Sequence, residues 1–471
     1  MTKKFFVTTP IYYVNDVPHI GHTCTTIVAD IIARYHKLLG EEVFFLTGTD
    51  EHGAKVAEEA KKVGLSPQDF CDKVSQTFAA IWPKLNIHFD YFIRTTNPQH
   101  EKIVQELIQK IYDRGDIYKA KYEGLYCVGC ERFYTEADLV DDKCPLHPNK
   151  EIQKQAENNY FFKLSKYAPL LIKAIENPTD LNHYQVSPSA KKEEILSKLK
   201  AGVGDLSISR ANVPWGIPIP WDKSQTIYVW FDALINYYSA LKITGKEGFW
   251  PANLHLIGKE ILWFHAVIWE AMLMAAKLPV PKEVFAHNFY MIDGRKMSKS
   301  LGNVIAPQQL MDKFGPEATR YLIASSFPYD KDSDVGLQRF TEKYNADLAN
   351  GLGNLVARVA KLCETKNYSP SNFESASLKI AGYHDFMQKF QVNLALEEIW
   401  KQIKALDVLI NNQKPWEKAD EEAQTTLTTA VGNILSIAKA VEPFLPETAA
   451  KIEKQFAGPK IKSAKPLFPR I

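Results

Sequence analysis

The sequence lacks several features that would assign it to a class at once. Its formal net charge is only +2 over 471 residues, so composition gives no argument for a nucleic-acid partner and any basic face must be local. No apolar run approaches the length of a membrane span, and the N-terminus has no signal-peptide core. Six cysteines do not make a disulfide scaffold in so long a chain. We therefore expect a cytoplasmic protein with reduced thiols and no membrane partner.

The familiar phosphate-binding loops are also missing. No G-x-G-x-x-G follows the first predicted strand. The segment GTDEHGAK comes close to a P-loop, but Gly53 is followed by Ala54, where that motif needs Lys and then Ser or Thr. Any nucleotide would have to be bound by other means.

The remaining sequence pattern is that of a globular α/β protein. A chain of this length usually holds roughly three domains. KKFFVTTP predicts a short buried strand ended by Pro10, residues 22–40 a helix ending at Gly40, and EEVFFLTGTDEHG a second strand. This strand–helix–strand order indicates an open, mostly parallel sheet. Periodicity weakens from about residue 115, as in an insertion. From about Thr341 the chain is almost wholly helical, with breaks at NNQKPW and EPFLPE.

Two short segments carry side chains suited to phosphate. In PHIGHTCTT, His19 and His22 flank Gly21 at the start of a helix, whose free N–H groups attract anions. The two imidazoles could donate hydrogen bonds to a phosphate in a transition state. Alternatively, His19 is a capping residue and His22 a partly exposed helix residue. In MIDGRKMSKSLGN, Lys296 and Lys299 lie in a Gly- and Ser-rich loop, which is either a mobile polyphosphate clamp or a solvated turn.

A third segment has the spacing of a metal site. Cys127, Cys130, Cys144 and His147 form a C-x2-C-x13-C-x2-H pattern. Two close pairs joined by a longer loop suit one tetrahedral Zn²⁺ with three thiolates and one imidazole. Four protein ligands leave no open position, so the zinc would be structural. A disulfide or unligated thiols are the alternatives.

The order HIGH, insertion, KMSKS resembles a class I aminoacyl-tRNA synthetase. TTPIYYVN, FLTGTDEHG, YVWFDALINY, LIGKEILWFHAVIW and NADLANGLGNLVAR look like methionyl-tRNA synthetase in particular, and the resemblance covers essentially the whole chain. It implies that L-methionine and ATP, with Mg²⁺, give methionyl-adenylate and pyrophosphate. Methionine then passes to the 3′-terminal adenosine of initiator and elongator tRNA(Met).

The resemblance also implies roles for individual residues. The catalytic and ATP-binding set is His19, Gly21, His22, Lys296, Ser298 and Lys299. The methionine-binding set is Ile11, Tyr13, Asp50, Trp230, Leu234, Tyr237, Ile261 and His265. The anticodon set is Asn354, Arg358 and Trp416, where a base edge or face would be recognised. Leu234 departs from relatives with proline there. The alternative for the aromatic residues of the methionine set is simple core packing. The alternatives for the anticodon set are a solvated Asn354–Arg358 face and a Trp416 that closes the helical bundle.

The fold implied is a Rossmann-like parallel-sheet catalytic domain split by a zinc-binding insertion and followed by an α-helical bundle anticodon-binding domain. The expected parts are residues 1–114 and 216–290 for the two catalytic halves, 115–215 for the insertion, 291–343 for the KMSKS loop and stem-contact region, and 344–471 for the bundle. We expect a monomer. Competing hypotheses are another HIGH-type nucleotidyl transferase and a catalytically dead RNA-binding paralogue.

Overall fold

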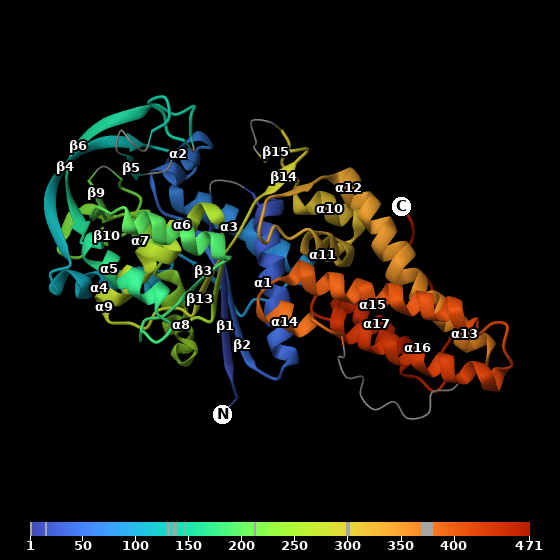
Figure 1. Ribbon diagram of the computed structural model, residues 1–471. Coiled ribbons are helices and arrows are strands. Elements are labelled where there is room, and N and C mark those ends of the chain that lie inside the picture. Colours follow the sequence, from blue (N-terminus) through green and yellow to red (C-terminus); the bar gives the residue numbers. More distant parts are fainter. Residues whose placement is uncertain are drawn as a thin grey trace. The chain divides into compact units, whose positions relative to one another are not determined.

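The computed structural model describes residues 2–14, 17–129, 132–134, 139–145, 147–211, 213–297, 302–368 and 380–471. The chain forms two compact units (Figure 1). The first unit comprises Met1–Pro18, Glu42–Ile81 and Phe89–His287, and the second comprises His19–Glu41, Trp82–His88 and Asn288–Ile471. None of the helices in the described ranges combines the length and apolar character that a membrane span needs.

The first unit is built on a six-stranded sheet with the order β3-β2-β1-β12-β13-β7. Every neighbouring pair in it is parallel, which confirms the sheet type predicted from the sequence. The strands are β1 (Lys4–Tyr13), β2 (Glu42–Asp50), β3 (Tyr91–Arg94), β7 (Gln185–Ser187), β12 (Leu254–Gly258) and β13 (Glu283–His287). Strands β2 and β3 follow β1 on one side, and β12 and β13 lie on its other side with β7 at the edge, so the strand order reverses at β1. Ligands are therefore expected beyond the carboxyl ends of β1 and its neighbours.

Short apolar runs, such as FFV in β1 and VFFL in β2, explain the central strands. Every residue of β2 after Glu42 is buried, as is usual for a parallel strand covered on both faces. The helices that follow or connect the strands are α2 (Ala54–Lys62), α3 (Pro67–Lys84), α4 (Pro98–Asp113), α5 (Leu164–Glu176), α6 (Ser189–Lys200), α7 (Val229–Ala233), α8 (Asn236–Thr244), η2 (Glu247–Phe249), η3 (Lys259–Ile261), the π-helical turn η4 (Phe264–Trp269) and α9 (Glu270–Ala276).

The predicted end of the first strand at Pro10 is wrong. Strand β1 continues to Tyr13, and its pairing with β2 shifts register between Thr8 and Ile11. Three steps along β1 match two along β2 there, which is a β-bulge. Proline has no N–H to give to a ladder and is tolerated at such a bulge. The strand therefore resumes, and Tyr13 pairs with Asp50.

Residues 115–215 include a four-stranded antiparallel sheet with the order β5-β4-β6-β8. Its two long strands form the teal arch of Figure 1. The strands are β4 (Ile117–Cys127), β5 (Arg132–Tyr134), β6 (Ile152–Phe162) and β8 (Leu206–Ser207). A smaller antiparallel sheet joins β9 (Ser209–Arg210), β10 (Pro218–Ile219) and β11 (Asp222–Ile227). The first sheet places Cys127 at the last position of β4.

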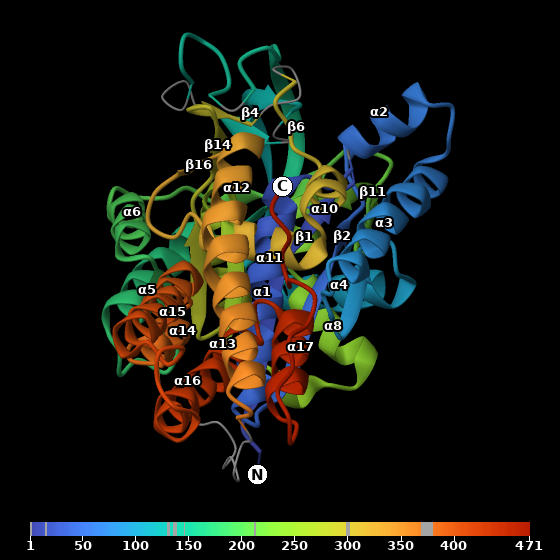
Figure 2. The same cartoon turned by 90° about the vertical axis from the view of Figure 1, so that its right-hand side faces the viewer.

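The second unit combines α1 (Ile20–Leu38), a small sheet and the C-terminal helices (Figure 2). The small sheet contains β14 (Tyr290–Ile292), β15 (Arg295–Lys296) and β16 (Ser333–Val335). The helices are α10 (Pro307–Phe314), α11 (Pro316–Ser325), α12 (Leu337–Lys343), the π-helix η6 (Tyr344–Gly353), α13 (Asn354–Thr365), α14 (Tyr383–Gln388), α15 (Val392–Gln413), α16 (Asp420–Val441) and α17 (Pro446–Phe456). The predicted helical C-terminal region and its two breaks are confirmed.

A buried arginine holds α1 within the second unit. Arg320 is fully buried on α11, and its guanidinium lies 2.7 Å from the carboxylate of Asp30 on α1. It also donates to the carbonyls of Pro443 and Phe444, which precede α17. Burying a charge is costly unless it is paired and fully hydrogen-bonded, and these contacts meet that condition. The first helix is therefore anchored to the C-terminal helices.

Candidate active site, metal cluster and RNA-facing residues

A small cavity opens at the carboxyl ends of β1 and β2 in the first unit. Its volume is about 250 Å³ including the mouth. The lining residues are Pro10, Ile11, Asp50, Trp230, Ala233, Leu234, Asn236, Tyr237 and His265. The wall is mostly apolar, and Asp50, which is 6% exposed, brings a carboxylate to it. Such a cavity suits a ligand that has an apolar side chain and, separately, a cationic group that can meet this carboxylate.

His265 and Tyr237 form the polar end of this cavity. Nδ1 of His265 lies 3.0 Å from the carbonyl of Ile261, so Nδ1 carries the proton and donates. Burial lowers the pKa of His265 to about 4, so its ring is neutral at physiological pH. Nε2 is then an acceptor, and the Tyr237 hydroxyl donates to it at 2.7 Å. The cavity thus contains a polar but uncharged pair.

The aromatic wall is fixed by stacking. The rings of Trp230 and Phe264 stack with centroids 3.9 Å apart and planes 12° from parallel. The Tyr237 ring lies 4.3 Å from that of His255, a fully buried residue whose Nδ1 is 2.7 Å from the Thr8 hydroxyl. Each of these contacts limits the rotation of a lining side chain. The cavity is largely pre-formed.

The structure brings together six of the eight residues predicted for methionine. Tyr13 and Ile261 do not line the cavity: Tyr13 is half-buried at the end of β1, and Ile261 contributes its carbonyl to His265. Sequence reasoning missed Pro10, Ala233 and Asn236. Their positions in the sequence could have indicated them: Pro10 precedes Ile11, and Ala233 lies three residues after Trp230, on the same face of a helix.

In the second unit, His19 and His22 cap helix α1 reciprocally. His19 is the N-cap residue, and its Nδ1 accepts from the Gly21 N–H at 3.1 Å. Nδ1 of His22 accepts from the His19 N–H at 3.3 Å, and the two rings stack with centroids 3.8 Å apart. The neutral form of each ring therefore carries its proton on Nε2. A Cβ on Gly21 would lie 2.9 Å from the His19 ring, so glycine is needed here.

The first half of the KMSKS segment lies beside this helix start. Asp293 and Gly294, with φ of 51° and 71°, form the turn between β14 and β15, as expected for Asp-Gly in a hairpin. Lys296 is exposed on β15 with Nζ 4.9 Å from the Phe289 ring centroid. A Cβ at Gly21 would lie 3.8 Å from Cε of Met297. The two motifs are therefore neighbours. Ser298 and Lys299 lie outside the described residues.

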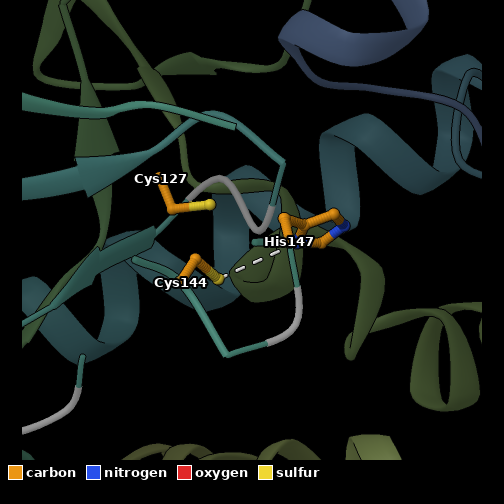
Figure 3. A group of neighbouring side chains, drawn as sticks. All are labelled: Cys127, Cys144 and His147. Atoms are coloured by element: carbon orange, nitrogen blue, oxygen red, sulfur yellow. Dashed lines mark hydrogen bonds between the residues drawn. The ribbon is translucent and has the colours of Figure 1, made fainter. Parts of the chain in front are cut away.

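Three of the four predicted zinc ligands converge in the first unit. The ligand atoms of Cys127, Cys144 and His147 all lie within 4.8 Å of one another (Figure 3). Cys144 Sγ is 4.0 Å from His147 Nδ1, and both cysteines are fully buried. A tetrahedral zinc with bonds of about 2.0–2.3 Å holds its ligand atoms roughly 3.3–3.8 Å apart. The donor set therefore fits that metal. Cys130, the predicted fourth ligand, lies outside the described residues.

Local structure explains how these ligands meet. The His147 N–H donates to the Cys144 carbonyl at 3.1 Å, which closes a tight turn. A Cβ on Gly129 would lie 2.6 Å from the His147 ring, so only glycine allows the two segments to approach this closely. The Tyr134 hydroxyl lies 3.4 Å from Cys144 Sγ.

Two of the three residues predicted for the anticodon are neighbours. Arg358 on α13 bonds to Asp407 at 2.7 Å and to Asn411 at 2.6 Å on α15. Its guanidinium lies 5.2 Å from the ring centroid of Trp416. Trp416 is 43% exposed, so it is not the core residue that the alternative interpretation required. Asn354, one helical turn before Arg358, is also exposed.

Comparison with known proteins agrees with this arrangement. The model of the family described as tRNA synthetases class I (M) matches residues 5–155 and 137–360. The methionine–tRNA ligase of Clostridium acetobutylicum is 41% identical over 509 residues, covering 100% of this chain and 78% of the relative. That of Thermotoga maritima is 41% identical over 475 residues, covering 95% and 74%. The methionyl-tRNA synthetase of Mycobacterium tuberculosis, solved with methionyl-adenylate, has a TM-score of 0.90 at 34% identity, covering 99% and 100%.

A parallel sheet with a cavity at its carboxyl edge, a histidine-capped helix beside a lysine hairpin and a helical C-terminal region define a class I aminoacyl-tRNA synthetase. The relatives that match nearly the full chain are all enzymes for the same amino acid, methionine. The chain belongs to the methionyl-tRNA synthetase family, whose members are ligases that join methionine to tRNA.

Proposed function

We propose that the chain activates L-methionine with ATP and transfers it to tRNA(Met), both initiator and elongator, with the residue roles set out below. The observation that supports this most directly is the cavity with Asp50 at its wall and the neutral His265–Tyr237 pair at its end. The relatives named above are methionine–tRNA ligases, and one was solved with methionyl-adenylate.

For methionine, we assign the α-ammonium to Asp50 and the carbonyl of Ile11, which lie on adjacent strands. The thioether chain would lie among Trp230, Leu234 and Tyr237, with Tyr13 and Ile261 supporting the pocket from outside its lining. The neutral His265–Tyr237 end of the pocket rejects charged side chains, because they would lose hydration there without gaining a partner. An unbranched, polarisable thioether meets no such penalty.

For ATP, which enters as its Mg²⁺ complex, the roles belong to the second unit. Nε2–H of His19 and His22 suits hydrogen bonds to the α-phosphate as charge develops there. Gly21 leaves the backbone open to the nucleotide. Lys296, Ser298 and Lys299 would bind the pyrophosphate leaving group. The methionine carboxylate attacks the α-phosphate in line, and the P–O bond to pyrophosphate breaks without a covalent enzyme intermediate.

For the insertion, we propose one structural zinc held by Cys127, Cys130, Cys144 and His147. The convergence of three of these donors supports it. Thiolate ligands require reduced cysteines, which agrees with the cytoplasmic location proposed from the sequence. Releasing the metal should loosen the segment around β4 and β5, since binding and local folding are coupled.

For tRNA, we propose that Asn354, Arg358 and Trp416 meet the anticodon. The exposed indole with a guanidinium over its face is a platform on which an unstacked base can stack. We retain the division into residues 1–114, 115–215, 216–290, 291–343 and 344–471 as a functional one, and propose that the enzyme acts as a monomer.

Methionine-dependent ATP–pyrophosphate exchange and tRNA(Met) aminoacylation test this proposal together. Both should proceed with L-methionine and fail with valine or isoleucine. Exchange with no amino-acid preference would indicate another nucleotidyl transferase, and tRNA binding without exchange would indicate a catalytically dead paralogue. Elemental analysis of freshly purified protein should find one zinc per chain in wild type and none in Cys127→Ser. A Cys127–Cys130 disulfide would contradict the zinc assignment.

A further inference from the structure

A group of buried polar side chains lies beside the cavity and has no part in the reaction described above. His52, His100 and Asp232 are at most 4% exposed. Oδ2 of Asp232 lies 2.7 Å from His52 Nδ1, and Oδ1 lies 2.8 Å from His100 Nε2. A carboxylate only accepts, so both ring nitrogens donate. Each oxygen of one buried carboxylate is therefore held by a different histidine.

The positions of these residues connect separate walls of the cavity. His52 follows Asp50 by two residues, just past the end of β2. Asp232 lies on α7, with the lining residues Trp230 and Leu234 two positions away on either side. The 2.7 Å bond between His52 and Asp232 thus joins the wall assigned to the α-ammonium with the wall assigned to the side chain.

His100 extends the connection to a third wall. It is fully buried on α4, and its Nδ1 lies 2.7 Å from the Ser239 hydroxyl on α8. Helix α8 carries Tyr237 two residues earlier. The network therefore reaches the elements of Asp50, Trp230 and Tyr237 through one carboxylate.

Glu51, which lies between Asp50 and His52, is anchored by contacts of its own. The buried carboxylate of Glu51 accepts from Nε and Nη2 of Arg94 at 2.8 and 2.9 Å and from the Thr49 hydroxyl at 2.6 Å. The Trp215 indole N–H donates to the Glu51 carbonyl at 2.6 Å. Since Glu51 is fixed independently, loss of the His52–Asp232 contact would release α7 without unfolding the end of β2.

The charges around His52 favour its contact with Asp232, which we call the bridge. Burial alone lowers the pKa of His52, but the facing carboxylate of Asp232, with Glu101 and Glu51, outweighs it and raises the pKa overall. Burial raises the pKa of Asp232, and the two histidines more than reverse this. Glu101 faces the other side of His52, with Oε1 3.7 Å from Nε2. Both shifts favour the charged forms of His52 and Asp232, and so favour an ion pair between them.

We propose that Asp232, held between His52 and His100, is a positioning residue that sets the distance between the two walls of the methionine pocket. This inference rests on the proposed pocket. Without the bridge, α7 shifts relative to Asp50, and methionine binding weakens while ATP binding does not, because the HIGH and KMSKS residues belong to the other unit. A misplacement of about 1 Å at a binding group is enough to produce a large loss of activity.

The test uses Asp232→Asn, His100→Gln and His52→Asn in pyrophosphate exchange. Asparagine at 52 keeps a donor near the Nδ1 position but cannot carry charge, so it separates the hydrogen bond from the ion pair. We expect Asp232→Asn to raise the KM for methionine about tenfold or more, with the KM for ATP changed by less than about twofold. His36→Asn is the matched control, because His36 is a buried histidine 2.8 Å from a carboxylate, Glu41, in the second unit.

The pH profile gives a readout that a merely structural role would not move. His52 is charged below its raised pKa and loses the ion pair as pH rises through that value, so the wild-type KM for methionine should increase there. In His52→Asn this step should disappear. The proposal is overturned if the three variants melt at lower temperature with an unchanged KM for methionine, or if both KM values rise together. Wild-type protein without methionine-dependent exchange would contradict the proposed function instead.

Discussion

The cavity of the first unit, to which we assign methionine, and the histidine and lysine motifs of the second unit, to which we assign ATP, are built on opposite principles. The cavity presents buried, mutually bonded side chains, and its polar end is the neutral His265–Tyr237 pair. The motifs present half-buried histidines oriented by backbone N–H groups and an exposed lysine on a hairpin. Selectivity for a small uncharged side chain needs rigidity and dryness, whereas binding a triphosphate needs cations that solvent can reach until ATP arrives.

The largest effect should come from removing charge in the second unit. We predict that Lys296→Ala or Lys299→Ala lowers the kcat of pyrophosphate exchange about 100-fold or more, because charge stabilisation in the transition state is typically worth several kcal/mol. Methionine affinity, measured by calorimetry, should be unchanged. Lys313→Ala is the control, since Lys313 also lies over a phenylalanine ring, at 5.3 Å from Phe314. If Lys313→Ala lowers the kcat as much as Lys296→Ala and Lys299→Ala do, the proposed role of these lysines in binding pyrophosphate is wrong.

A smaller effect should come from the exposed Trp416 indole, for which we propose a contact with tRNA and none with ATP or methionine. We predict that Trp416→Ala reduces the rate of tRNA(Met) aminoacylation about 10- to 100-fold, since stacking is worth roughly 1–3 kcal/mol per base. Pyrophosphate exchange should remain near wild type. Trp400→Ala is the contrasting variant: its indole N–H donates to the Asp347 carbonyl and its ring stacks on Tyr321, so its loss should depress both reactions and the melting temperature. A Trp416→Ala variant behaving like Trp400→Ala would refute the anticodon role.

Sequence reasoning found the sheet type and the helical C-terminal region because each leaves a local mark, as short apolar runs and 3.6-residue periodicity. The six cavity residues came from the family resemblance. It misplaced the end of β1 because Pro10 punctuates a strand locally, while the bulge that accommodates it depends on pairing with β2. It missed the His52–Asp232 contact because 180 residues separate the partners. Asp232 lies inside an apolar segment and looks like an ordinary polar interruption; only the fold brings a histidine to it.

The hydroxyl at the end of the cavity allows a finer test of the first unit. We predict that Tyr237→Phe raises the KM for methionine about fivefold to 30-fold, because it leaves the buried acceptor Nε2 of His265 without its donor, at a cost of about 1–2 kcal/mol. The KM for ATP should not change. Tyr238→Phe is a matched control, as the Tyr238 ring packs edge-on against Trp250 with centroids 5.6 Å apart. Similar KM values for the two variants would place the hydroxyl outside the binding event.

The last effect concerns stability and follows from the neutrality of the His265–Tyr237 pair. The pKa of His265 is about 4 in the folded protein, against an ordinary value of 6.5, because burial disfavours the charged ring. Between these values the unfolded chain binds a proton that the folded one does not, so the free energy of unfolding must fall as pH drops from 6.5 towards 4, by at most about 3 kcal/mol. Burial also lowers the pKa of His255, which adds an effect of the same sign. Urea unfolding of His265→Gln at several pH values should show a shallower decline in the free energy of unfolding than wild type. An unchanged slope in His265→Gln would mean that the ring is charged in the folded state, and the neutral description of the cavity would then be wrong.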